Sequence, residues 1–322
     1  MTDSVIGLDL GGTKVAAALF DPSGRLADRR TAALEHRTGR AVGALLSELI
    51  HALLDSAARD GTSVAGIGIA VPGIYRDRTE TVWAPNIPGW TDYPLVAEMR
   101  AGVPNGVTVQ VDSDRACAIL GETWRGGAAG VRNAVFLVVG TGIGAGILVD
   151  GRILRGAGDA AGAIGWLALD RPYLDGYEAV GCFEFHASGP GIAAKARRLL
   201  ATSDASDRAL RRQDMASLTA RDVFAAYDAQ DPVAARVLDE AVGYWGMAVA
   251  NLVSLFDPET IVFGGGVFGP ATRFLERIRQ EAQRWAQPVS IRRVTLQASQ
   301  LGDDAVLYGA GRLALTGQRE PS

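Results

Sequence analysis

Two glycine-rich turns hold the residues best suited to bind phosphate. In the hexapeptide DLGGTK, the missing side chains let backbone N–H groups approach an anion, and a threonine and a lysine add donors. Its chemically useful residues are Asp9, Gly11, Gly12, Thr13 and Lys14. The Asp9 carboxylate is a suitable ligand for Mg²⁺, directly or through water. A tight turn with a solvated Asp9 explains the hexapeptide equally well, so this turn alone decides nothing.

The second turn strengthens the phosphate interpretation. Gly140, Thr141 and Gly142 repeat the chemistry of the first turn within the sequence GTGIG. Two such turns facing each other across a cleft would hold a triphosphate from both sides. The pairing is therefore more informative than either turn alone.

A third glycine cluster suits a nucleoside. Gly264, Gly265 and Gly266 follow a β-branched strand, where bare backbone would let an adenine ring lie flat. Close packing between a strand and the following helix explains this cluster equally well.

The elements that must position these turns alternate between strand and helix. Apolar runs on either side of the first turn predict a hairpin, and leucines spaced by three and four residues predict an amphipathic helix after it. A first lobe closes near residue 125, and a second hairpin opens another lobe. The expected strands and helices are 5–10, 15–20, 40–58, 64–71, 107–111, 116–124, 133–139, 145–149, 191–200, 232–256 and 261–263, with helices after Pro270 and Asp303.

Composition excludes several classes of protein. Of the 322 residues, 48% are hydrophobic and 21% charged, which is typical of a folded globular chain of about two domains. The formal net charge of −4 offers no broad basic surface, so neither nucleic acid nor a membrane is an expected partner. Two cysteines, Cys117 and Cys182, indicate a reducing compartment, and the most lipid-like stretch, 244–256, is too short to span a bilayer. We therefore expect a cytoplasmic protein.

Four segments, in order and spacing, resemble the ROK family of sugar kinases. They are DLGGTK at 9–14, VVGTGIGAG at 138–146, IVFGGGVF at 261–268 and GDDAVLYGAGRLA at 302–314. The resemblance spans essentially the whole chain and implies a two-lobed α/β fold of the actin-like, ribonuclease H-like ATPase type. It implies an N-terminal lobe at 1–125, completed by a C-terminal helix at 303–316, and a C-terminal lobe at 126–302. It also implies ATP and Mg²⁺ as cofactors, a sugar or cyclitol as small-molecule partner, and a homodimer.

The same resemblance assigns a catalytic carboxylate. The family segment VENDANAAALGE is similar to VDSDRACAILGE here, so the matching aspartate is Asp114 and not Asp112. As general base, Asp114 would orient an acceptor hydroxyl and take its proton late, because phosphoryl transfer has a loose transition state. An isolated aspartate at this position would equally suit the N-cap of a helix.

The chain departs from the family pattern around the acceptor. The asparagine that precedes the catalytic aspartate is Ser113 here. In RGAGDAAGAIGW, the family's sugar-binding glutamate is replaced by Ala163, and its sugar-binding, zinc-ligating histidine is replaced by Trp166. The family's zinc loop is similar to residues 175–182, where only Cys182 remains of three cysteines. Because a structural zinc site needs four ligands, we expect none.

One side of the acceptor pocket is retained. By resemblance, the residues expected to contact the acceptor are Gly73, Asn86, Gly89, Ser113, Asp114, Trp166 and Glu184. A site emptied of hydrogen-bonding groups disfavours a substrate that needs them, which makes plain glucose a poor acceptor. Trp166 either offers a flat apolar face to an altered ring or packs into the core where the zinc loop would be anchored.

These residues together predict an ATP-dependent kinase for the primary hydroxyl of a sugar-like acceptor. The favoured acceptor is a C7-cyclitol or a modified or amino hexose from secondary metabolism, such as antibiotic biosynthesis. An ordinary hexose kinase of the glucokinase type is one alternative, and a non-catalytic sugar-binding regulator is another. Regulators of this family carry a DNA-binding helix-turn-helix ahead of the kinase-like body, and with Asp9 so near the start we expect none here.

Overall fold

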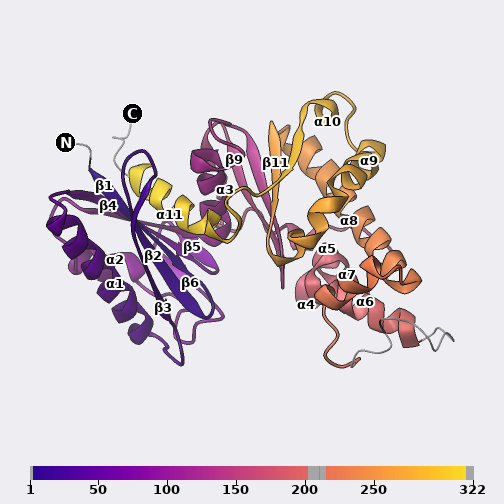
Figure 1. The fold of residues 1–322 in the computed structure, drawn as a ribbon, viewed down its shortest axis with the longest axis horizontal. Helices are drawn as coiled ribbons and strands as arrows, with labels where there is room; N and C mark the ends of the chain where they lie inside the picture. The colour runs from indigo at the N-terminus through magenta and orange to yellow at the C-terminus, as the bar shows by residue number, and fades with distance from the viewer. Residues whose placement is uncertain (1–2, 202–209, 211–214, 317–322) are drawn as a thin grey trace. The chain divides into compact units, whose positions relative to one another are not determined.

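The computed structural model describes residues 3–201, 210 and 215–316, and the chain divides into two compact units (Figure 1). The first unit contains the chain up to Val131, the segment Ile153–Ala161 and the chain from Ser299 onward. The second unit contains Arg132–Arg152 and Gly162–Ala298. The division expected at residue 125 therefore falls after Val131, and Ile153–Ala161, expected in the second lobe, belongs to the first unit.

A five-stranded sheet in the order β3-β2-β1-β4-β7 forms the centre of the first unit. β2 pairs antiparallel with both β1 and β3, whereas β1, β4 and β7 run parallel. The expected hairpin of β1 and β2 is confirmed. The strands are β1 (Ser4–Leu10), β2 (Lys14–Phe20), β3 (Leu26–Ala33), β4 (Val64–Val71) and β7 (Thr108–Ser113), with a separate pair β5 (Ile74–Arg76) and β6 (Thr81–Trp83).

Helices cover both faces of this sheet. Because successive side chains of a strand point to opposite faces, neighbouring residues of β1 contact different helices. Leu8 and Leu10 are completely buried in the cluster that the apolar side of α1 completes. Gly7 and Asp9 therefore point to the opposite face, where α3 and α11 pack. The helices of the unit are α1 (Arg40–Arg59), α2 (Leu95–Ala101), α3 (Asp114–Arg125) and α11 (Ala305–Thr316).

Glycines let α11 approach its neighbours more closely than side chains would allow. A methyl group at Gly309 would overlap the carbonyl of Cys117 on α3, and one at Gly121 would overlap the carbonyl of Ala305. At Gly68 on β4, a methyl group would overlap the carbonyl of Ala310. The last helix of the chain is thus packed backbone against backbone between α3 and the sheet.

We expect Gly309→Ala to destabilise the protein, because overfilling a closely packed contact typically costs about 1–3 kcal/mol. The matched control is Gly243→Ala in α8 (Pro232–Phe256), where a methyl group would meet nothing within 4 Å. That change should be neutral or stabilising by up to about 1 kcal/mol, because alanine favours a helix interior over glycine. Urea unfolding of both variants measures the difference, and equal free energies of unfolding would contradict the packing.

The second unit repeats the topology of the first. Its sheet has the order β10-β9-β8-β11-β12, with an antiparallel hairpin of β8 and β9 followed by parallel β11 and β12. A helical layer centred on α8 packs with the sheet into one core (Figure 1). The elements are β8 (Ala134–Val139), β9 (Ile143–Val149), β10 (Arg152–Ile153), β11 (Thr260–Gly264), β12 (Thr295–Ala298), α4 (Tyr177–Val180), α5 (Cys182–Ala187), α6 (Gly189–Ala201), α7 (Ala220–Asp228), α9 (Leu275–Trp285) and α10 (Ser290–Arg293), with 3₁₀ turns η1 (Ile164–Trp166), η3 (Gly266–Phe268), η4 (Pro270–Phe274) and η5 (Gly302–Asp304).

Among the described residues, α1 is the one helix long and apolar enough to cross a membrane by length and composition. Its apolar residues belong to the core of the first unit, because Val42, Leu46 and Leu53 are completely buried with the sheet. The stretch 244–256, which the sequence marked as most lipid-like, is the second half of α8, and most of its apolar side chains are buried.

Candidate active site

The first glycine turn joins β1 to β2 and exposes its backbone. The N–H of Gly11 donates to the carbonyl of Lys14 at 3.0 Å and closes the turn. Gly12, Thr13 and Lys14 are exposed, so their donors are accessible to an anion. A methyl group at Gly12 would lie 3.5 Å from Asn86 Nδ2. Gly12, which is expected to bind phosphate, and Asn86, which is expected to contact the acceptor, are therefore neighbours in the first unit.

Asp9 and Asp112 lie on the same face of the first sheet, and Asp114 follows two residues later at the start of α3. Asp9 lies in register with Ala70 of β4, which is in turn in register with Asp112 of β7. Burial and, after it, the charge of Asp114 raise the pKa of Asp9 to about 6, against the opposing charge of Lys14. Burial likewise raises the pKa of Asp114, against the charge of Arg115. The charge of Asp114 thus acts on Asp9, and both carboxylates lie in a desolvated region.

The corner between β7 and α3 sets the position of Asp114. Ser113 is the N-cap of α3, and its Oγ accepts from the N–H of Ala116 at 3.3 Å. Asp114 is the first residue of the helix, and its Oδ1 accepts from the N–H of Arg115 at 2.7 Å. The alternative that Asp114 is the N-cap is wrong, because Ser113 occupies that position.

The first unit fits a hydrated magnesium ion better than a metal held by protein alone. Within the described ranges, no group of three or more histidine, cysteine, aspartate or glutamate side chains is arranged to hold a metal. Magnesium, however, usually takes one or two carboxylates and completes its shell with water and substrate phosphates. Asp9, which is partly buried next to the exposed glycine turn, suits that arrangement.

We expect the pKa of Asp9 to fall in Asp114→Asn, because the negative charge of Asp114 disfavours ionisation of its neighbour. A carboxyl ¹³C NMR titration of the protein without nucleotide should give a value near 6 for Asp9 in the parent and a lower value in the variant. Asp60→Asn, at an exposed position after α1, should leave Asp9 unchanged. An identical Asp9 titration in parent and Asp114→Asn would show that the two carboxylates do not interact.

The second glycine turn lies in the second unit between β8 and β9. The N–H of Gly140 donates to the carbonyl of Gly142 at 2.9 Å, and Thr141 and Gly142 are exposed. Glu184 Oε2 accepts from the N–H of Ile143 at 2.7 Å, which attaches Glu184 to the end of the turn. Burial raises the pKa of Glu184, and this hydrogen bond opposes the rise. Since the two turns belong to different units, their joint hold on one triphosphate stays a prediction.

The third glycine cluster divides into packing and accessible positions. A methyl group at Gly264 would overlap the ring of Phe136, so this glycine serves the packing of the sheet. Gly265 and Gly266 are exposed, and a methyl group at Gly140 would lie 4.0 Å from the N of Gly266. The second turn and the expected adenosine segment are therefore neighbours within the second unit.

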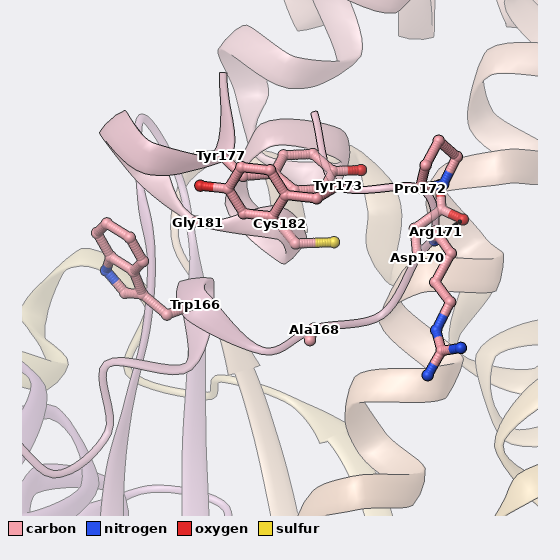
Figure 2. Close-up of a pocket in the computed structure, with 9 residues that line it drawn as sticks. All are labelled: Trp166, Ala168, Asp170, Arg171, Pro172, Tyr173, Tyr177, Gly181 and Cys182. Carbon is pink, nitrogen blue, oxygen red and sulfur yellow. Dashed lines mark hydrogen bonds between the residues drawn. The ribbon is translucent and has the colours of Figure 1, made fainter. Parts of the chain in front are cut away.

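Trp166 lines a surface pocket of the second unit (Figure 2). Its side chain is 58% exposed, so the alternative that it packs into the core is wrong. The pocket has a volume of about 410 Å³. It is lined by Trp166, Ala168, Asp170, Arg171, Pro172, Tyr173, Tyr177, Gly181 and Cys182. Glu184 is not among these residues, although a methyl group at Gly165, the residue before Trp166, would lie 2.9 Å from Glu184 Oε2.

The loop around this pocket does not fit a structural zinc ion. Cys182 is buried, Asp175 is exposed, and His186 Nε2 lies 2.6 Å from the hydroxyl of Tyr177 in a hydrogen bond. The His186 ring stacks on Tyr244 with centroids 4.4 Å apart. Hydrogen bonds and aromatic contacts thus hold together the segment that the resemblance had suggested as a zinc loop.

The remaining acceptor candidates lie around β5 and β6 of the first unit. Gly73 has a φ of 137°, and a methyl group there would overlap the carbonyl of Trp83, so only glycine suits this position. Asn86 and Gly89 are exposed, and the following Trp90 is buried and donates from Nε1 to the carbonyl of Gly39 at 3.1 Å. Burial of Trp90 fixes the segment that presents Asn86.

Asp112 pairs with Arg155, a partner that no local feature of the sequence predicts. Arg155 Nη2 lies 2.8 Å from Asp112 Oδ2, although the two residues are 43 positions apart in the sequence. The signal was present in RGAGDAAGAIGW, where an arginine opens the acceptor segment, but nothing local in the sequence links it to β7.

The chain is similar to known sugar kinases along almost its whole length. Residues 5–317 match the model of the ROK family. The chain is 34% identical to a glucokinase of Halalkalibacterium halodurans, over 96% of this chain and 94% of the relative. It is 32% identical to an N-acetylmannosamine kinase of Citrobacter koseri, over 97% of this chain and 98% of the relative.

A solved structure shares the fold along the whole chain. A ROK family glucokinase from Streptomyces griseus, in complex with glucose and AMPPNP, is similar with a TM-score of 0.75 and 31% identity. The match covers 98% of this chain and 100% of that chain. The protein therefore belongs to the ROK family, and its two α/β units have the actin-like ATPase fold of the family's sugar kinases.

Proposed function

We propose that this protein transfers the γ-phosphoryl group of ATP to the primary hydroxyl of a sugar-like acceptor. The observation that carries the proposal is the interacting pair Asp9 and Asp114, partly buried on the face of the sheet that ends at the exposed turn of Gly11 and Gly12. Such a pair offers one carboxylate to a phosphate-bound cation and another to an alcohol. Family membership and the two glycine turns support the nucleotide as ATP.

Each residue has a defined part in the proposed transfer. The acceptor oxygen bonds to the γ-phosphorus as the bond from that phosphorus to the bridging oxygen of ADP breaks, and the hydroxyl proton passes to an Asp114 oxygen. Because burial raises the pKa of Asp114, this carboxylate holds a proton more readily than an exposed aspartate. Asp9 would hold Mg²⁺, which neutralises phosphate charge when bound. Backbone N–H groups and Lys14 orient the phosphates.

The acceptor we propose is a hexose-like ring with an altered hydroxyl pattern, such as a C7-cyclitol or an amino or otherwise modified hexose. The supporting observation is the loss of hydrogen-bonding side chains at Ala163 and Trp166, both of which are exposed. Without those side chains, an acceptor that lacks the matching hydroxyls leaves fewer polar groups of the site unpaired, so its binding is weakened less. The names of the relatives make glucose and N-acetylmannosamine the reference acceptors against which this preference is judged.

Three further expectations belong to the same proposal. The two units form the lobes of one nucleotide-binding enzyme, the metal is Mg²⁺, and the protein acts as a homodimer in the cytoplasm.

A coupled assay of ADP release across an acceptor panel tests the proposed activity. The panel contains glucose, N-acetylmannosamine, glucosamine, other modified hexoses and C7-cyclitols. We expect turnover with at least one ring bearing a primary hydroxyl, and a higher kcat/KM for a modified ring than for glucose. Turnover fastest with glucose would overturn the acceptor preference and leave a glucokinase-type enzyme. Saturable sugar binding without turnover of any acceptor would instead establish a non-catalytic binding protein.

Asp114→Asn tests the assignment of the base. Loss of the carboxylate should lower kcat about 10²- to 10⁴-fold, the usual contribution of general base catalysis, while ATP binding by calorimetry stays within a few-fold of the parent. Asp60→Asn should retain parental kcat, because this aspartate is exposed after α1. A variant at position 114 that turned over near the parental rate would show that another group receives the proton.

A further inference from the structure

The buried carboxylate of Asp112 has a single charged partner within hydrogen-bonding distance in the described structure. Asp112 is only 4% exposed and lies at the end of β7, two residues before Asp114. Its Oδ1 accepts from the N–H of Ser113 at 2.7 Å. Its Oδ2 is enclosed and accepts no hydrogen bond of good geometry from the described residues, but Arg155 Nη2 lies 2.8 Å away in an ion pair.

Arg155 reaches Asp112 from a segment that interrupts the second unit. The chain leaves that unit after Arg152 and re-enters it at Gly162, and the intervening Ile153–Ala161 belongs to the first unit. The Arg155 guanidinium also lies 6.0 Å from the ring centroid of Tyr75 on β5. This segment is therefore attached to the first unit by a charge pair and a cation–π contact.

The charges that face Asp112 make Arg155 important. Burial is the largest influence on the pKa of Asp112 and raises it. The charge of Arg155 and the hydrogen bond from the N–H of Ser113 lower it, whereas the charges of Asp77 and Asp159 raise it. The positive charge of Arg155 thus compensates the buried carboxylate of Asp112, which the negative charges of Asp77 and Asp159 destabilise. Removing one member of such a pair leaves an uncompensated buried charge, whereas removing both members is milder.

A short covalent route connects this ion pair to the proposed base. The Asp112 carboxylate accepts a hydrogen bond from the N–H of Ser113. Ser113 is the N-cap of α3, and Asp114 is the first residue of that helix. A shift of the Asp112 carboxylate therefore changes the backbone that presents Asp114. Arg155 itself touches none of the residues of the first glycine turn in the contacts described above.

We infer that Arg155 is a positioning residue for the phosphoryl transfer, acting on Asp114 through the buried carboxylate of Asp112. This inference rests on the proposed function, since it concerns the same base. It assigns a part in the reaction to an arginine that opens the acceptor segment and does not contact the nucleotide turn. Its consequence is a loss of turnover without a matching loss of ATP affinity.

The test compares Arg155→Met, Asp112→Asn and the double variant with Arg152→Met as matched control. Arg152 is exposed on β10, and removing it takes away one positive charge three positions earlier. We expect Arg155→Met to lower kcat at least tenfold with the KM for ATP within twofold of the parent. The double variant should be more active than Arg155→Met, and Arg152→Met should match the parent. Parental kcat in Arg155→Met would overturn the inference.

A second measurement separates this inference from the proposed function. The carboxyl ¹³C signal of Asp114, assigned by its absence in Asp114→Asn, should move in Arg155→Met, return toward its parental position in the double variant and stay in place in Arg152→Met. If the parent turns over no acceptor but the signal moves in this way, the positioning stands and the kinase proposal fails. An unmoved signal would overturn the positioning whatever the activity. Arg155→Gln, which removes the charge but keeps a polar side chain, serves if Arg155→Met does not fold.

Discussion

The approach of α11 to α3 and to the strands beneath it leaves no room for side chains at Gly68, Gly121 and Gly309. This contact closes the α3 and α11 face of the first sheet, the face to which Asp9 points. A layer of helix placed directly on the strand backbones keeps water away from that face, so carboxylates at its edge are desolvated. The raised pKa values of Asp9 and Asp114 follow from this burial. The charges of Lys14 and Arg29 oppose the rise at Asp9, and the charge of Arg115 opposes it at Asp114.

Much of the fold was predictable because its signals are local. Strand β1 was expected from an apolar run and helix α1 from apolar residues spaced by three and four, and both are present within a few residues of the expected bounds. Strand β3 was not expected. It is an edge strand with an exposed side, and charges such as Arg29 and Arg30 interrupt its apolar pattern. Edge strands depend on pairing with a neighbour, which composition does not report.

The site was predictable in its residue types and less so in its connections. Both glycine turns could be recognised because phosphate binding needs bare backbone at a bend. That Ser113, rather than Asp114, caps α3 depends on the angle at which β7 enters the helix. The pairing of Arg155 with Asp112 joins positions distant in the chain, and no periodicity encodes it. Trp166 was undecided from the sequence because the same residue type suits a core or a pocket, and only its surroundings distinguish them.

Hydrogen bonds and ring contacts hold the loop around Trp166 in place. The Tyr177 hydroxyl lies 2.6 Å from His186 Nε2 in a hydrogen bond, and the His186 ring stacks on Tyr244. Tyr244 also donates to Asp170 Oδ2 at 2.7 Å, which joins the start of the loop to α8. Aromatic packing and charge-assisted hydrogen bonds can hold a short loop without metal, and they leave a pocket whose walls are mainly apolar.

The most direct test of the account is a crystal structure of the protein with a non-hydrolysable ATP analogue and an acceptor that it phosphorylates. We predict that an Asp114 oxygen lies within about 2.6–3.2 Å of the hydroxyl that receives the phosphoryl group, the distance that proton transfer to a base requires. The phosphates should contact the backbone N–H groups of Gly12 and Thr13. An acceptor hydroxyl directed to a different side chain, with Asp114 turned away from it, would contradict the account.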